Sequence, residues 1–288
     1  MTYNFIIRNN DININVVTHD MCNPSAVLIH IHGLGSHFQS DYDCMDTFIN
    51  RVDCFQKNNI VSYGLELRGH GKSSGAKYYV DNFDDYLSDL DALIQYINLY
   101  HNNLPIYLLG FSMGGAIAIK YSIVFNNKQK IAGVILLSPL CGIIKNYSNI
   151  VISSMYYLSY LIPTWKLISN NNKLELYDIE YINNKVNSIY NNNNPHMLCI
   201  ARECYNAVNW INTNLHLFNT PVIAFHSKND TTTDYIKTQE FIEKCSSNDK
   251  KIIITNEGYH NLLAPCNMND FGPNNIMKDI SSWLYDRI

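Results

Sequence analysis

A serine at a predicted sharp turn is the residue whose setting most strongly suggests chemistry. Ser112 is the central residue of Gly110-Phe111-Ser112-Met113-Gly114, which fits the pattern G-x-S-x-G. An apolar run at 106–109 precedes this pattern and another at 116–119 follows it, so the expected local structure is strand, tight turn and helix. The flanking glycines leave room at a strained turn, and the helix directs its positive end toward a developing anion. We predict that Ser112 is a nucleophile; a simple tight turn before a core helix is the alternative.

Candidate base and acid residues that could activate this serine come directly after two apolar runs later in the sequence. A serine hydroxyl needs a base to remove its proton, and the base needs an acceptor that fixes its tautomer. Asp230 follows the run at 222–225, and His260 follows the run at 251–255. Both lie just beyond a predicted strand, which is where ligands bind in open α/β sheets. The order Ser112, Asp230, His260 is the order expected for an α/β-hydrolase triad.

Other titratable residues near these positions leave alternatives open. Asp234 could take the acid role in place of Asp230, and His260 could be a surface loop histidine. His32 is predicted to shape its loop and not to act in catalysis. The two remaining candidates, His30 and His226, are interpreted as strand or strand-end histidines without a role.

The elements that must position these side chains are indicated by apolar periodicity. Predicted strands alternate with predicted helices, which implies a mostly parallel sheet covered by helices on both faces, an α/β class. The first two strands are expected to form a β-hairpin. The predicted strands are 5–8, 12–18, 26–32, 60–67, 106–109, 131–137, 222–225 and 251–255, and the predicted helices lie within 41–57, 84–100, 235–245 and 275–287.

This alternation stops between residues 140 and 220. Short helical-looking pieces there are broken by asparagine runs and by two prolines, with no clear strand. We predict a core made of 1–139 and 221–288, and a helical cap inserted as 140–220. The apolar stretch 150–162 favours a lining for an acyl chain and transient contact with a membrane surface. Its candidate substrate-binding residues are Met155, Leu158 and Leu161; packing of the cap on the core is the alternative.

Composition limits the class of protein. The chain has 288 residues, of which 47% are hydrophobic and only 16% charged, so a sizeable core can form. The net charge is −4 and no run of Lys and Arg occurs, which argues against nucleic acid as a partner. The 8 cysteines include no C-x-x-C pair, so no metal site is expected. With no signal peptide or membrane-spanning stretch, we expect a cytoplasmic protein that contacts membranes at most peripherally.

Taken together, these motifs resemble the α/β-hydrolase family, in particular its members of the monoacylglycerol lipase and lysophospholipase type. The matching segments are His32-Gly33-Leu34-Gly35, Arg68-Gly69-His70-Gly71-Lys72-Ser73, Gly110-Phe111-Ser112-Met113-Gly114-Gly115-Ala116, Ser138-Pro139, Asn229-Asp230 and Gly258-Tyr259-His260. They cover roughly the first half and the last quarter of the chain.

The resemblance implies a set of roles and an α/β-hydrolase fold with a helical cap. Ser112 would be the nucleophile, His260 the general base and then acid, and Asp230 the orienting carboxylate. The backbone N–H groups of Leu34 and Met113 would form the oxyanion hole. The substrate would be a lipid ester, first of all a monoacylglycerol, cleaved through an acyl-serine intermediate without a cofactor or metal.

Two departures from the family and several alternatives remain at this point. Glu66 stands where the family has an aspartate, which concerns local packing, and Thr233 stands where mammalian members have a cysteine. A lysophospholipase, a thioesterase, a small-ester carboxylesterase or a peptidase could use the same triad. A non-catalytic, hydrolase-like interaction protein is the alternative of another class, although such a protein is expected to have lost a triad member.

Overall fold

The main feature of the fold is one eight-stranded sheet. The computed structural model describes residues 2–19, 21–38, 55–101, 103–126, 131–143, 148–168, 196–264 and 273–288. The strands run in the order β1-β2-β4-β3-β5-β6-β9-β10; their bounds are β1 Thr2–Asn9, β2 Ile12–His19, β3 Ala26–Ile31, β4 Ile60–Leu65, β5 Ile106–Phe111, β6 Ile131–Leu137, β9 Val222–Ser227 and β10 Lys250–Thr255. All neighbours from β4 to β10 pair in parallel, as predicted, whereas β1–β2 and β2–β4 are antiparallel.

The predicted hairpin opens the sheet. The β1–β2 register runs without a break from the pair Thr2 and His19 to the pair Asn9 and Ile12. Asn10 occupies the tight turn with φ 53°, a left-handed conformation that asparagine tolerates better than most residues. The hairpin prediction is therefore confirmed: β1 extends beyond its apolar run at both ends, and β2 is one residue longer than its run.

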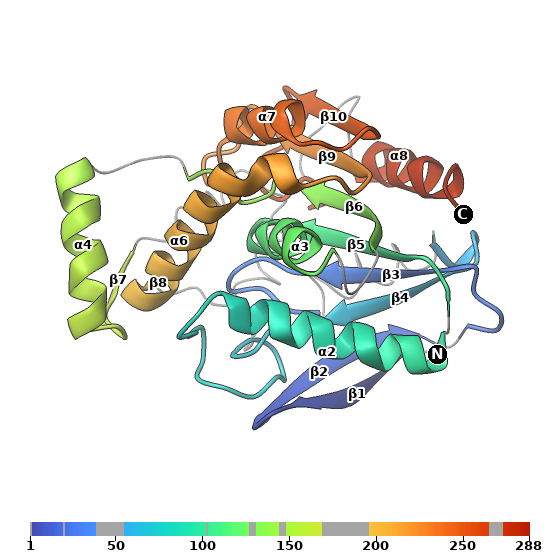
Figure 1. Ribbon diagram of the computed structural model, residues 1–288, viewed down its shortest axis with the longest axis horizontal. Helices are drawn as coiled ribbons and strands as arrows, with labels where there is room; N and C mark the ends of the chain where they lie inside the picture. Colours follow the sequence, from blue (N-terminus) through green and yellow to red (C-terminus); the bar gives the residue numbers. More distant parts are fainter. Residues whose placement is uncertain are drawn as a thin grey trace.

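Helices cover both faces of the sheet because side chains alternate along each strand. On β3, Val27, Ile29 and Ile31 share a buried cluster with α2 (Asp84–Tyr100) and α3 (Met113–Val124). Ala26 and Leu28 point to the other face, into a cluster with α8 (Pro273–Tyr285). Figure 1 shows α2 and α3 lying across the sheet.

The observed helices agree closely with the predicted helix bounds in the parts of the chain that the structure describes. α2 has the predicted bounds and buries Leu87, Leu90 and Ile97 among others, and α7 (Tyr235–Lys244) and α8 begin and end within two residues of their predictions. The helix predicted within 41–57 lies outside the described residues except for its last three positions.

The chain between β6 and β9 is built differently. It contributes α4 (Asn149–Leu161), β7 (Lys166–Ile168), β8 (His196–Met197), α6 (Leu198–Asn214) and the 3₁₀ turn η2 (Leu215–Leu217). α6 packs against both α3 and α4, whereas α4 lies at the edge of the molecule (Figure 1). The small β7–β8 pair was not predicted, since strands of two or three residues carry no readable periodicity. Within the described ranges, no helix has both the length and the apolarity that crossing a membrane requires.

Candidate active site

The turn between β5 and α3 holds Ser112 in an unusual backbone conformation. Its φ is 53° and its ψ is −116°, a strained combination for a residue with a side chain. The turn is close-packed on both sides. A Cβ atom on Gly110 would overlap the carbonyl oxygen of Gly114, and one on Gly114 would overlap the carbonyl oxygen of Ile31. Glycine is therefore required at both positions, as the motif predicted, and the turn presents the Ser112 hydroxyl at the carboxyl edge of the sheet.

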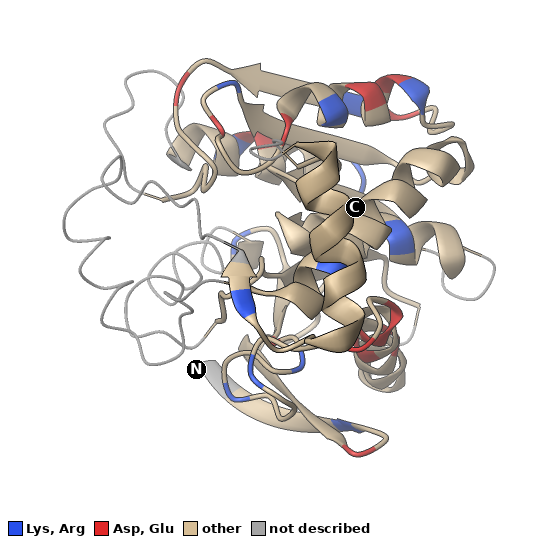
Figure 2. Cartoon of the chain, turned by 90° about the vertical axis from the view of Figure 1, so that its left-hand side faces the viewer, with Lys and Arg blue, Asp and Glu red and all other residues tan. Residues whose placement is uncertain are grey.

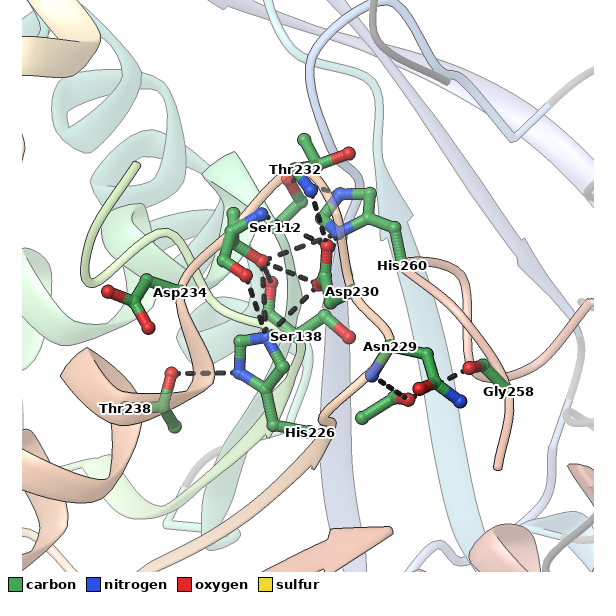
Figure 3. Close-up of polar contacts among 12 residues, drawn as sticks. Ser112, Ser138, His226, Asn229, Asp230, Thr232, Asp234, Thr238, Gly258 and His260 are labelled. Atoms are coloured by element: carbon green, nitrogen blue, oxygen red, sulfur yellow. Dashed lines mark hydrogen bonds and ion pairs between the residues drawn. The ribbon is translucent and has the colours of Figure 1, made fainter. Parts of the chain in front are cut away.

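Three side chains from distant segments form one chain of hydrogen bonds at this edge (Figure 3). Nε2 of His260 lies 3.0 Å from Oγ of Ser112, and Nδ1 of the same ring lies 2.8 Å from Oδ2 of Asp230. The ring of Phe111 packs against the His260 ring with 5.0 Å between their centroids. This geometry allows His260 to take the Ser112 proton at one nitrogen while Asp230 holds the other nitrogen protonated.

The Asp230 carboxylate is buried, and both of its oxygens accept hydrogen bonds. Its Oδ1 accepts hydrogen bonds from the backbone N–H groups of Thr232 (2.7 Å) and Thr233 (3.0 Å), and its Oδ2 accepts from the Thr233 hydroxyl at 2.8 Å. Burial alone would raise the pKa of the Asp230 carboxyl. The adjacent His260 and the hydrogen bonds from neighbouring histidines outweigh burial and hold this pKa well below its usual range. The carboxyl is therefore charged at neutral pH.

The alternative acid has a different position. Oδ1 of Asp234 accepts a hydrogen bond of 2.9 Å from the backbone N–H of Ile236, so Asp234 caps the first turn of α7. The carboxylate next to His260 is that of Asp230.

A second histidine, His226, contacts the same carboxylate. It lies in β9, as the interpretation of a strand histidine expected, but its contact with Asp230 was not predicted. His226 ends up beside Asp230 because the chain turns back on itself directly after β9. Its Nε2 lies 3.0 Å from Oδ2 of Asp230, and its Nδ1 lies 2.9 Å from Oγ1 of Thr238 on α7. The four-residue spacing to Asp230 was the only signal in the sequence that could have indicated this contact.

The loop that carries Leu34 lies against the Ser112 turn. A Cβ atom on Gly33 would be 3.1 Å from Cβ of Ser112, so the two backbones approach closely. His32 holds this loop, with Nδ1 2.8 Å from the carbonyl oxygen of Gly33 and Nε2 3.1 Å from the backbone nitrogen of Leu67. Burial is the main cause that lowers the pKa of His32, which is therefore neutral and can donate at Nδ1 while accepting at Nε2.

Met113 is the first residue of α3, so its N–H group has no partner inside the helix. Together with the loop contact at Gly33, this places both predicted oxyanion-hole residues next to Ser112. The assignment of the two N–H groups as oxyanion donors stays a prediction.

The three predicted substrate-binding residues all lie on α4. Leu158 is 36% exposed and Leu161 is 81% exposed. Arg202 of α6 connects this helix to the rest of the chain, since its guanidinium lies 4.4 Å from the Tyr160 ring centroid and 3.3 Å from the carbonyl oxygen of Ser159. An exposure of this size suits a surface contact better than an enclosed pocket, and the assignment of Met155, Leu158 and Leu161 stays a prediction.

Glu66, which stands where the family has an aspartate, is buried, and its carboxylate accepts several hydrogen bonds. The carboxylate accepts hydrogen bonds from the backbone nitrogens of Phe38 (3.1 Å) and Lys72 (2.8 Å) and from Nδ2 of Asn15 (3.0 Å). Burial raises the pKa of Glu66 despite these donors. A Cβ atom on Gly71 would overlap this carboxylate, so the glycine-rich loop is built around the longer acid.

Comparisons with known proteins bear on this site. A family model described as "Serine aminopeptidase, S33" matches residues 22–266. The chain is 24% identical over 275 residues to the monoglyceride lipase of Rattus norvegicus, which covers 92% of this chain and 84% of that protein. It is 24% identical over 272 residues to a monoglyceride lipase homolog of Monkeypox virus, covering 92% and 91%. A solved structure, a soluble variant of the monoglyceride lipase from Saccharomyces cerevisiae in complex with a substrate analog, aligns with a TM-score of 0.83 at 19% identity, covering 100% of this chain and 95% of that one.

Proposed function

Because the chain belongs to the serine aminopeptidase S33 family of hydrolases, we propose that it is a serine ester hydrolase that acts through Ser112, His260 and Asp230. This membership confirms the α/β-hydrolase resemblance and fold class that the motifs predicted. The similarity to lipases and esterases supports a carboxylic ester as the bond that is cleaved. The observation that carries the proposal is the hydrogen-bond chain from Ser112 through His260 to Asp230, with distances of 3.0 Å and 2.8 Å.

The proposed reaction has two halves. In the first, Oγ of Ser112 attacks the ester carbonyl while Nε2 of His260 takes its proton; the ring then returns this proton to the departing alcohol. In the second, Nε2 of His260 removes a proton from water, whose oxygen attacks the acyl-Ser112; the bond from the acyl carbon to Oγ then breaks, His260 returns the proton to Oγ, and the carboxylic acid leaves. The N–H groups of Leu34 and Met113 would hold the oxyanion, and each such donor is worth about 2.7–4 kcal/mol of barrier.

The proposed substrate is a lipid ester, most specifically a monoacylglycerol. Support comes from the names of the relatives, which are monoglyceride lipases, and from the apolar character of α4. A lysophospholipid, an acyl thioester or a small ester could be cleaved by the same three side chains, so these compounds serve as competitors in the test below.

We further propose that residues 140–220 form a cap over the core and that α4 is the part of it that meets a lipid surface. α4 has no Asp, Glu, Lys or Arg, and Figure 2, which views the molecule from the side where α4 lies, shows few charges on the front helices. Ile150 is 79% exposed, Tyr157 71% and Leu161 81%. Exposed apolar side chains gathered on one helix can bind a membrane interface.

The experiment is fatty-acid release from a chain-length series of monoacylglycerols, lysophospholipids and acyl thioesters, with the wild type beside Ser112→Ala. We expect release that is greatest with monoacylglycerols, together with a loss of at least about 10⁴-fold in Ser112→Ala while its circular dichroism and melting temperature stay the same. Release that persists in Ser112→Ala would refute the nucleophile assignment. Serine-dependent release greatest with another class would keep the mechanism and replace the substrate.

A further inference from the structure

One oxygen of the Asp230 carboxylate lies within hydrogen-bond distance of two imidazole rings. Oδ2 of Asp230 lies 2.8 Å from Nδ1 of His260 and 3.0 Å from Nε2 of His226. His260 faces Ser112, whereas His226 is completely buried on the side of α7 (Figure 3). The proposed mechanism uses the first ring and gives the second ring no role. A buried histidine on the acid of the site therefore needs its own explanation.

The contacts of His226 fix the position of its proton. An ionised carboxylate only accepts hydrogen bonds, so Nε2 of His226 must carry the hydrogen that points at Asp230. In the neutral ring Nδ1 is then an acceptor, and the Thr238 hydroxyl at 2.9 Å can donate to it. Thr238 is fully buried in α7. The ring is thus held from both ends, by a helix on one side and by the carboxylate on the other.

This arrangement restricts the carboxylate. The backbone N–H groups of Thr232 and Thr233 hold Oδ1, and the Thr233 hydroxyl and His226 hold Oδ2, so Asp230 cannot rotate without losing several bonds to a charged and buried group. Among these donors, only His226 belongs to β9, the strand that precedes the turn. Its bond therefore ties the Asp230 carboxylate to the sheet.

We propose that His226 is a positioning residue for the reaction, one that orients the Asp230 carboxylate toward His260 by donating a hydrogen bond to Oδ2. The inference rests on the proposed function, since it concerns the same Ser112, His260 and Asp230. His226 touches neither Ser112 nor the substrate in this mechanism and acts only through Asp230. Its loss should therefore lower the rate of the chemical step and leave substrate binding unchanged.

Two amide substitutions separate this role from simple packing. The amide nitrogen of glutamine can occupy the place of Nε2, so His226→Gln keeps a donor for Asp230 but loses the Thr238 contact. The shorter asparagine matches Nδ1, so His226→Asn keeps a partner for Thr238 but offers no donor to Asp230. We expect kcat to fall about 10- to 100-fold in His226→Asn with KM within about twofold, and to stay within about threefold of wild type in His226→Gln.

The measurements are kcat and KM for the best ester, and the rate at which a fluorophosphonate labels Ser112. In that labelling the serine oxygen displaces fluoride from phosphorus, so it reports activation of Ser112 without requiring the right lipid. His30 on β3 provides the matched control, because it is also a buried strand histidine, with Nε2 3.1 Å from Oγ of Ser62. His30→Asn should lower the melting temperature without a selective effect on kcat.

The outcomes are distinct. Equal kcat and labelling rates in the Asn and Gln variants, or a change in KM alone, would overturn the positioning role while the proposed function stands. A wild type that neither hydrolyses an ester nor reacts with the fluorophosphonate would overturn the proposed function and, with it, this inference. Selective loss in His226→Asn, with the Gln variant active, supports it whichever ester proves best.

Discussion

At the scale of single residues, the charge of Asp230 has a testable consequence. The carboxylate accepts from Nδ1 of His260, and this bond keeps the other nitrogen free to accept the Ser112 proton. Asp230→Asn keeps the shape of the side chain but can turn an N–H₂ group toward Nδ1. The ring would then carry its proton on Nε2, where it cannot act as a base.

We expect Asp230→Asn to lower kcat about 10⁴-fold with little change in KM, as measured by steady-state ester hydrolysis. A second measurement follows from the low pKa of Asp230. The pKa of this carboxyl is lower in the folded chain than in the unfolded chain. The contribution of the charged carboxylate to the free energy of unfolding is therefore present above about pH 4 and is lost as the pH falls further. Wild type and variant should therefore differ less in melting temperature at pH 3.5 than at pH 7. A variant with normal kcat would show that another group orients His260.

Sequence reasoning identified those site residues that end a strand. Ser112, Asp230 and His260 each follow an apolar run, and the carboxyl ends of parallel strands meet at one edge, so their proximity could be predicted. The contact of His226 could not be predicted, because this residue directly follows the apolar run 222–225 and continues the strand β9. Only the tight turn after β9, which no periodicity describes, brings its Nε2 to Asp230.

At the scale of elements, the glycine-rich loop after β4 contains a buried neutral histidine. Nδ1 of His70 lies 3.0 Å from the carbonyl oxygen of Arg68, and its Nε2 is buried without a hydrogen-bond partner among the described residues. Burial, with smaller contributions from Lys77 and His196, lowers the pKa of His70 from its usual 6.5 to about 4. Protonation would place a charge and an unbonded N–H group inside the loop.

This loop should therefore make stability depend on pH. Between pH 6.5 and pH 4 the unfolded chain binds a proton at His70 and the folded chain does not, so the free energy of unfolding falls as the pH falls, by up to about 1.4 kcal/mol per pH unit. Urea unfolding at a series of pH values should show a shallower slope for His70→Gln over this range. Equal slopes for wild type and His70→Gln would contradict the prediction.

The elements themselves were largely predictable, whereas their arrangement was only partly so. Long apolar runs indicated every strand of the main sheet, and α2 was predicted with its observed bounds. The sheet order β2-β4-β3 depends on crossovers, which periodicity does not encode. The loop around Glu66 likewise depends on hydrogen bonds between distant segments, such as the one from Asn15.

At the scale of the whole molecule, α4, the helix that we propose meets a lipid surface, differs in charge from other elements with exposed apolar side chains. Exposed leucines occur elsewhere as well, and Leu99 at the end of α2 is as exposed as Leu161, at 81%. Leu99 lies in a helix that also carries several aspartates, whereas α4 has no charged residue. A membrane interface favours apolar groups that are gathered on one face and not opposed by anionic neighbours. Leu161 and Leu99 thus offer a matched pair for a binding experiment.

We expect the protein to sediment with vesicles of phosphatidylcholine and phosphatidylserine, and the double variant Ile150→Asp, Leu161→Asp to remain mostly in the supernatant, because each substitution replaces apolar contact area with a charge. The control Leu99→Asp should bind vesicles as wild type does. Hydrolysis of a short, water-soluble ester should be unchanged in both variants, since neither touches Ser112, while hydrolysis of a long-chain monoacylglycerol in vesicles should fall only in the α4 variant. Equal sedimentation of all three proteins would mean that α4 is an exposed surface without a lipid partner, and that substrate reaches Ser112 from solution.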